Sequence, residues 1–375
     1  MKKRALILLG HQQAMVNFCA LFKSIGVDTF APPFISDEEK NYESTYREHS
    51  TILNEELTNR YNLFNKNMSK EGADAICNII ASMNFDFIIS YFFVPEKLNL
   101  RLMDLNCPKY FLIWGDGVLP SETGYEGLAQ FNTKFINSNS SRYIFCHKHL
   151  LPIATKNLPT NKFAQLNIPI KDMCELENSW ACSDESNNKV LIVCSRVFSR
   201  QQTCIKVLAS CRDWLLSLCK ANPDIEFVLV GKDNSNIPNG MVPENLSVHE
   251  CGHINEVFSF MQRCKLMFNF HPILLGVSNG LVIQYSQIEA SCIGIPILHC
   301  STTRITDHIG FNSEFIFEFK NHPHLYFDHQ SASIKLQNLL TKSRVKLKQL
   351  SSYQSSLYNN YKISNIKHKY LSSFF

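Results

Sequence analysis

Residues 266–298 have the sequence LMFNFHPILLGVSNGLVIQYSQIEASCIGIPIL, and this stretch decides the fold. The apolar run 266–270 predicts a strand, and the polar turn at 278–280 is followed by a predicted helix over 281–292. A Gly-Ile-Pro turn then leads into the next strand, which begins within 294–298. Strands that alternate with helices of roughly 10–15 residues are typical of parallel sheets built from βαβ units.

The same alternation occurs in two blocks on either side of an acidic, Ser- and Asn-rich linker at 171–188. The second block begins with KVLIVC at 189–194, and the first with RALILLG at 4–10. A continuous apolar run that ends in glycine before a helical segment predicts a buried parallel strand. We therefore expect an α/β protein with two Rossmann-like parallel-sheet domains that face a cleft.

The expected domains are 1–175 and 176–330, since one core seldom grows beyond ~250–300 residues. The polar segment 36–75, rich in Glu and Asn, is expected to form helices that project from the first domain. Residues 331–375 are expected to form basic amphipathic helices that pack back on the first domain.

The charge is distributed unevenly along the chain. The net charge is +4, from 37 Lys and Arg against 33 Asp and Glu. Residues 329–375 hold eight basic and no acidic side chains, so residues 1–328 carry 29 − 33 = −4. The fourteen cysteines form no CxxC pair or zinc-finger spacing, which favours a reducing compartment. The chain has no recognisable signal peptide or membrane-length apolar run, so we expect a cytoplasmic protein.

The second block resembles the donor domain of GT-B glycosyltransferases, in the broad group that includes the family 4 enzymes. The best match is EASCIGIP at 289–296, which is similar to the family signature E-A-x-x-x-G-x-P. The order of the preceding segments also agrees over roughly residues 189–320. Leu281 stands where the family has the first of two paired glutamates. The resemblance implies a nucleotide-diphosphate sugar as co-substrate, with no other cofactor.

A nucleotide sugar presents a ribose diol and two phosphates, and the second block offers groups suited to both. Glu289, one or two turns into its helix, can accept both ribose hydroxyls. Helix N-terminal amides favour a diphosphate, and guanidinium groups can stabilise a leaving phosphate. The remaining candidate donor-binding residues are Arg196, Arg200, Gly231, Lys232, Gly252, His253, Ser278, Asn279 and Gly280. The alternative for most of them is an ordinary turn or surface role.

Two residues of the first domain are candidate catalytic groups. His11 follows the first predicted strand, where a histidine can deprotonate an acceptor hydroxyl near neutral pH. Inverting GT-B enzymes often use a histidine in a similar loop. Asp116, in the sequence Trp-Gly-Asp-Gly, can orient the histidine, hold the sugar or act as the base. The histidine suggests inversion and the family 4 likeness suggests retention, so both outcomes stay open.

The sequence lacks the motifs of several other enzyme classes. The chain has no G-x-S-x-G elbow, no P-loop and no G-x-G-x-x-G, which disfavours hydrolases, P-loop phosphotransferases and NAD enzymes. No D-x-D follows a predicted strand, so we expect a metal-independent enzyme.

The expected acceptor is a saccharide or lipid-linked glycan of a surface polysaccharide. One alternative is a phage-type enzyme that glycosylates hydroxymethylated bases in DNA, because a basic tail can contact phosphates. A catalytically inactive module that binds a sugar nucleotide is a third hypothesis. The basic, aromatic tail also suits peripheral contact with the inner membrane face, and a solvated helix face is its plain alternative.

Overall fold

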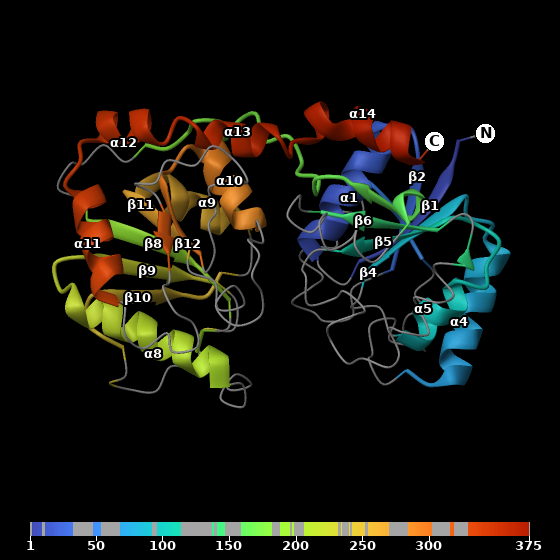
Figure 1. Ribbon diagram of the computed structural model, residues 1–375, viewed down its shortest axis with the longest axis horizontal. Coiled ribbons are helices and arrows are strands. Elements are labelled where there is room, and N and C mark those ends of the chain that lie inside the picture. Colours follow the sequence, from blue (N-terminus) through green and yellow to red (C-terminus); the bar gives the residue numbers. More distant parts are fainter. Residues whose placement is uncertain are drawn as a thin grey trace. The chain divides into compact units, whose positions relative to one another are not determined.

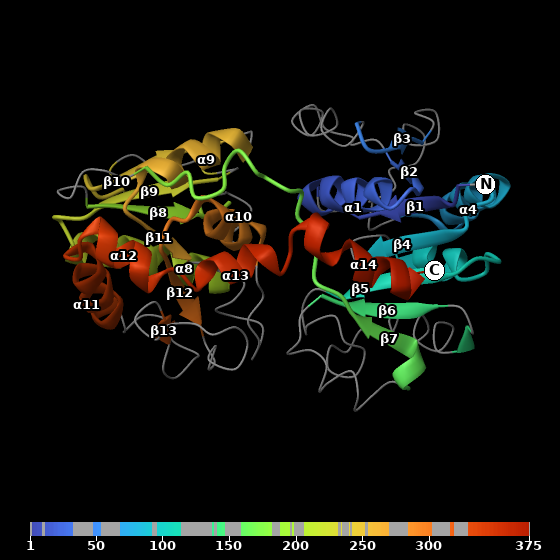
Figure 2. The ribbon, with the colours of Figure 1, turned by 90° about the horizontal axis from the view of Figure 1, so that it is seen from above.

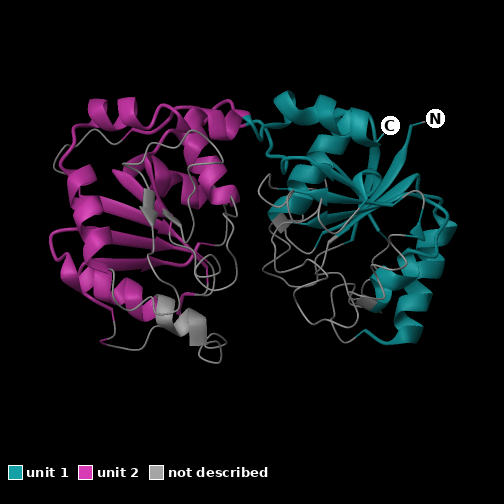
Figure 3. Ribbon diagram, in the orientation of Figure 1, with its two compact units in different colours: residues 1–172, 360–375 teal, residues 173–359 magenta. Residues whose placement is uncertain are grey.

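The computed structural model divides the chain into two compact units (Figures 1 and 3). The first unit comprises Met1–Asp172 with Asn360–Phe375, and the second comprises Met173–Asn359. The described residues are 2–9, 12–32, 48–53, 68–91, 96–113, 137–138, 141–146, 159–181, 188–195, 197–198, 206–231, 234, 240, 242–251, 254–269, 284–301, 316–318 and 329–374.

The described strands of the first unit form a seven-stranded parallel sheet in the order β3-β2-β1-β4-β5-β6-β7. Their bounds are Arg4–Leu8 (β1), Asp28–Ala31 (β2), Thr51–Ile52 (β3), Phe87–Tyr91 (β4), Lys109–Ile113 (β5), Arg142–Phe145 (β6) and Phe163–Gln165 (β7). The accompanying helices are Gln12–Ser24 (α1), Lys70–Ser82 (α4), Glu96–Leu102 (α5), the short 3-10 turn Thr160–Lys162 (η3) and Ile363–Phe374 (α14). Residues 5–8 of β1 are fully buried, as their continuous apolar run predicts.

The structure describes residues 48–53 and 68–75 of the segment 36–75. Residues 70–75 begin helix α4, as expected, whereas residues 51–52 differ from the expectation of projecting helices. Thr51 and Ile52 pair in parallel with Phe30 and Ala31, so this part is an edge strand of the sheet instead of a projecting helix. The Thr29 hydroxyl also donates to the His49 carbonyl. Leu53 is buried, and its burial explains why the chain enters the sheet here.

The described strands of the second unit form a six-stranded parallel sheet in the order β10-β9-β8-β11-β12-β13. Their bounds are Lys189–Val193 (β8), Glu226–Val230 (β9), Leu246–His249 (β10), Leu266–Asn269 (β11), Ile297–Ser301 (β12) and Ile316–Glu318 (β13). The helices are Lys206–Ala221 (α8), Ile254–Arg263 (α9), Tyr285–Ile293 (α10), His329–Leu340 (α11), Arg344–Leu350 (α12) and Gln354–Asn359 (α13).

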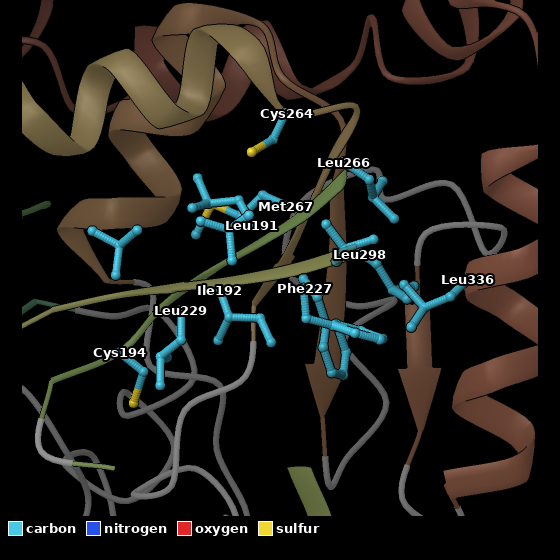
Figure 4. Packing of buried hydrophobic residues seen from close by; sticks show 14 of the residues in the cluster. Leu191, Ile192, Cys194, Phe227, Leu229, Cys264, Leu266, Met267, Leu298 and Leu336 are labelled. Atoms are coloured by element: carbon cyan, nitrogen blue, oxygen red, sulfur yellow. The ribbon is translucent and has the colours of Figure 1, made fainter. Parts of the chain in front are cut away.

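Helices cover both faces of this sheet (Figure 1). In that view α8 lies below the strands, and α9 and α10 lie above them. Figure 4 shows the core that results, with Leu336 of α11 directed towards Phe227 and Leu298 of the sheet. Burial on both faces explains why these strands are continuous apolar runs without alternation.

The C-terminal segment is shared between the two units, which corrects the prediction that 331–375 packs as a whole on the first domain. Helices α11, α12 and α13 belong to the second unit, and only Asn360–Phe375 belongs to the first. The reason is the apolar face of α11 and α12, where Ala332, Leu336 and Leu347 are fully buried in the second unit's core.

Helix α14 completes the first unit and lies beside α1 in both views (Figures 1 and 2). The Phe374 ring lies 5.3 Å from Phe22 and 4.0 Å from Tyr110, measured between ring centroids. The Tyr370 hydroxyl donates to the Asn167 carbonyl at 2.7 Å. Aromatic residues therefore attach the end of the chain to the first sheet. Over the described residues, every helix is too short or too polar to cross a membrane.

Candidate functional site

The second unit has a topological switch point between β8 and β11. From β8 the chain builds outward through β9 and β10 on one side, and then returns to the other side with β11, β12 and β13. In open α/β sheets, ligands bind outside the carboxyl ends of the strands at such a point. The residues that end β8, β9 and β11 are therefore the first place to look for a site.

Gly231 follows β9 and lies against the end of β8. A Cβ atom at this position would meet the Cys194 carbonyl group, at 2.6 Å from its carbon, and would lie 2.8 Å from the Ser195 nitrogen. The Gly231 amide donates to the His249 carbonyl at 3.1 Å. Only glycine fits so close to a neighbouring backbone. The structure thus gives this predicted site residue a packing role that holds two strand ends together.

Asn234 is a residue of this edge that sequence analysis did not single out. Its side chain is fully buried, and its Nδ2 donates to the carbonyl oxygens of Cys194 at 2.9 Å and Gly231 at 3.2 Å. Its Oδ1 accepts from the Phe198 amide at 3.3 Å. One asparagine therefore ties together the loops after β8 and β9. An Asn soon after a strand-ending glycine was the available signal.

Glu289 lies one turn into α10 and is 3% exposed, which excludes an ordinary exposed helix side chain. The helix ends at Gly294, whose φ of +89° is the left-handed conformation of a helix cap. The chain then turns at once, and the Pro296 carbonyl accepts from the Met267 amide at 2.9 Å. The spacing of E-A-x-x-x-G-x-P thus places a buried carboxylate, a helix stop and a strand entry in succession.

The start of α10 corrects the expectation that Ser278, Asn279 and Gly280 open this helix. Its N-cap is Gln284, and the Gln284 amide donates to the Gln287 Oε1 at 2.8 Å. The first-turn amides of α10 therefore belong to residues after Gly280.

Gln287 also connects α10 to the sheet. Because its Oε1 accepts from Gln284, its Nε2 is the group that donates to His299 Nδ1, at 3.0 Å. His299 is fully buried in β12, and desolvation lowers the pKa of its imidazole from 6.5 to about 3. A buried neutral histidine is therefore built into the sheet next to α10.

Asn269 ends β11 beside His299, which is its register partner in β12. It is 2% exposed, and among the described residues its Nδ2 has no hydrogen-bond partner. No motif marks either residue, although a polar side chain at the end of the apolar run LMFN was a signal for Asn269.

The other predicted site residues are not among those that the structure describes. They are His11, Asp116, Arg196, Arg200, Lys232, Gly252, His253, Ser278, Asn279 and Gly280. Within the described part of the chain, no three His, Cys, Asp or Glu side chains are grouped to hold a metal ion.

No protein-family model and no curated protein sequence matches the chain. Similar solved structures cover it almost completely. Anabaena Alr3699/HepE in complex with UDP-glucose is 11% identical, with a TM-score of 0.65 over 99% of this chain and 98% of that one. The pneumococcal O-GlcNAc transferase GtfA, in complex with UDP and GlcNAc, is 8% identical, with a TM-score of 0.64 over 100% and 98%.

A third similar structure is the UDP-GlcNAc 2-epimerase from Neisseria meningitidis bound to UDP-GlcNAc. It is 12% identical, with a TM-score of 0.55 over 99% of each chain. Identities this low establish the fold alone. The chain has the GT-B fold, with two parallel sheets flanked by helices, and this confirms the predicted α/β class with two parallel-sheet domains and the resemblance to GT-B proteins.

Proposed function

We propose that this protein is a glycosyltransferase that moves a sugar from a nucleotide-diphosphate donor to a hydroxyl acceptor. In this proposal the second unit binds the donor and the first unit, with its 36–75 segment, binds the acceptor. The similar structures support it because their proteins were solved with UDP or UDP-sugars across the same fold. The enzyme would be metal-independent, with basic side chains and backbone amides facing the diphosphate.

The observation that carries the proposal is the burial of Glu289. Its carboxylate is 3% exposed and so lies in the protein interior, where a side chain of an ordinary surface helix does not lie. A ribose diol offers two hydroxyl donors to the two oxygens of one carboxylate. Gln287, two residues before Glu289 in α10, contacts His299 of β12, which pairs with Asn269 at the end of β11. This place of α10 near the carboxyl ends of the strands supports a role of Glu289 in donor binding.

A thermal-shift screen against UDP, ADP, GDP, dTDP and their sugars tests this proposal. A ligand at 100 times its Kd stabilises the folded protein by about 2.7 kcal/mol. Glu289→Ala should weaken binding of the identified ligand by roughly 2–4 kcal/mol, because charge-assisted hydrogen bonds are lost. Glu250→Ala, at an exposed position of the same unit, is the matched control. Equal affinity for both variants would remove Glu289 from the site.

For the chemical step, we propose His11 as the base that takes the acceptor proton, with Asp116 orienting it or holding the sugar. Inversion and retention are distinguished by the anomeric configuration of the product, observed by proton NMR before mutarotation.

The proposed acceptor is a saccharide or lipid-linked glycan, with the protein in the cytoplasm and its basic helices able to meet the inner membrane face. DNA with hydroxymethylated bases is the rival acceptor. Transfer of labelled sugar to each substrate class, assayed side by side, separates them. Label found only in DNA would overturn the glycan proposal, and donor binding without any turnover would favour an inactive binding module.

A second candidate function follows from the epimerase among the similar structures. A 2-epimerase changes its UDP-sugar without any acceptor. Incubation of the protein with UDP-GlcNAc alone therefore discriminates between the two, because a new UDP-sugar in that mixture indicates epimerisation.

A further inference from the structure

Asn269 holds a buried hydrogen-bond donor that the described chain does not use. The residue is 2% exposed, and its Nδ2 has no partner among the described residues. Leaving a buried polar group without a partner normally destabilises a fold, so each such group in a native structure needs an explanation. At the end of a strand beside a switch point, a bound ligand is one such explanation.

The face on which Asn269 lies follows from its neighbours. Phe268 points to the α8 face, where its ring centroid lies 6.1 Å from that of Trp214. Successive strand residues alternate between faces, so Asn269 points to the opposite face, the one covered by α9 and α10. His299, its register partner in β12, contacts Gln287 of α10 and so lies on the same face. The Nδ1 atom of His299 already accepts a hydrogen bond from Gln287 Nε2.

The position along the strand points to the ligand group. Asn269 is the last residue of β11, and β11 pairs directly with β8 across the switch point. The loop after the first strand of such a sheet is where dinucleotide folds place the pyrophosphate. In this chain the corresponding loop begins at Cys194 and Ser195, which pack against Gly231.

We propose that the Asn269 side-chain amide donates a hydrogen bond to an oxygen of the donor's diphosphate. This inference rests on the proposed function and adds a binding residue to its site. A neutral amide at this place can donate a directed hydrogen bond to a phosphate oxygen without adding a positive charge to the site. The unpaired Nδ2 is therefore expected to lower the stability of the unliganded protein.

Asn234 provides a matched control, because it is a second buried asparagine at the same sheet edge. Both of its side-chain polar atoms are used inside the protein, by Cys194, Gly231 and Phe198. Replacing it removes internal hydrogen bonds, whereas replacing Asn269 removes none among the described residues. The two variants should therefore behave in opposite ways.

The test compares Asn269→Leu and Asn234→Leu in the full chain by thermal unfolding without ligand. Leucine in place of an unpaired donor is close to neutral or stabilising, so the Tm of Asn269→Leu should equal or exceed that of the wild type. The Tm of Asn234→Leu should fall by about 5 °C or more. A fall of the same size in Asn269→Leu would assign Asn269 an internal structural role and overturn the proposal.

Binding is then measured with UDP by calorimetry and with uridine by ligand-observed NMR, with ADP, GDP and dTDP in parallel. Asn269→Leu should raise the Kd for the diphosphate about 10- to 100-fold and leave that for the nucleoside within about twofold. Asn269→Asp should bind the diphosphate more weakly still, because its carboxylate repels phosphate. Unchanged diphosphate affinity in both variants would overturn the proposal. If the wild type binds none of these nucleotides, the proposed function itself fails.

Discussion

The buried histidine of β12 leads to a quantitative prediction about pH. His299 is fully buried, and desolvation lowers the pKa of its imidazole from 6.5 to about 3. The pKa of His299 is lower in the folded state than in the unfolded state. Its contribution to the free energy of unfolding is therefore fully present above pH 6.5, where the ring is neutral in both states. That contribution is lost as the pH falls towards 3, because the unfolded chain takes up a proton that the folded chain refuses.

The magnitude follows from the size of the shift. A pH of 5 lies about 1.5 units below the pKa of the unfolded imidazole, and each unit corresponds to about 1.36 kcal/mol. Lowering the pH from 8 to 5 should therefore remove about 2 kcal/mol of stability from the second unit through this residue alone. The loss should reach about 4 kcal/mol at pH 3.

Urea unfolding followed by tryptophan fluorescence measures this loss in the right unit. Trp180 and Trp214 are both buried in the second unit, and a Trp114→Phe background removes the remaining tryptophan. His299→Gln keeps a hydrogen-bonding group beside Gln287 but does not titrate. The wild type should lose about 2 kcal/mol more than this variant between pH 8 and 5. Equal losses would refute the assignment of a buried neutral His299.

Three further predictions test other parts of the structure. Gly240→Ala should destabilise the second unit by roughly 1–2 kcal/mol, because Gly240 has open space around it and only an unfavourable φ of +76°. Gly231→Ala should destabilise the same unit by more, because its Cβ would meet the Cys194 backbone. Equal urea midpoints of the two variants would contradict this close approach. Phe374→Ala should destabilise the first unit by about 3 kcal/mol, whereas Leu371→Ala, at a position 37% exposed, should change its stability by less than about 0.5 kcal/mol in the same denaturation assay. His11→Ala should abolish sugar transfer and spare nucleotide binding, and normal turnover would exclude it as the base.

The fold was largely predictable because buried parallel strands leave a strong local signal. The apolar runs at 4–10 and 189–194 contain strands β1 and β8, and the helix and strands predicted around 281–298 occur close to their expected places. The prediction failed where a few residues join a sheet by pairing, as Thr51 and Ile52 do. Two residues carry no periodicity, and only their partners in β2 define them as a strand.

The candidate site was predictable only in part, for a related reason. Glu289 was recognised because a helix stop and a proline follow it at fixed spacing. Asn234 and Asn269 belong to no local pattern, and their roles depend on which strand ends lie side by side. The C-terminal helices are a further example, since their charge says little about which core their apolar faces enter.

The sequence by itself therefore determined two α/β units, the GT-B fold class and the glutamate to examine first, because hydrophobic pattern and short-range spacing are local properties. Only the tertiary structure decided that α11 to α13 stay with the second unit while α14 joins the first. It also decided that one buried asparagine is fully bonded while another keeps an unused donor, because hydrogen-bond partners come from segments far apart in the chain.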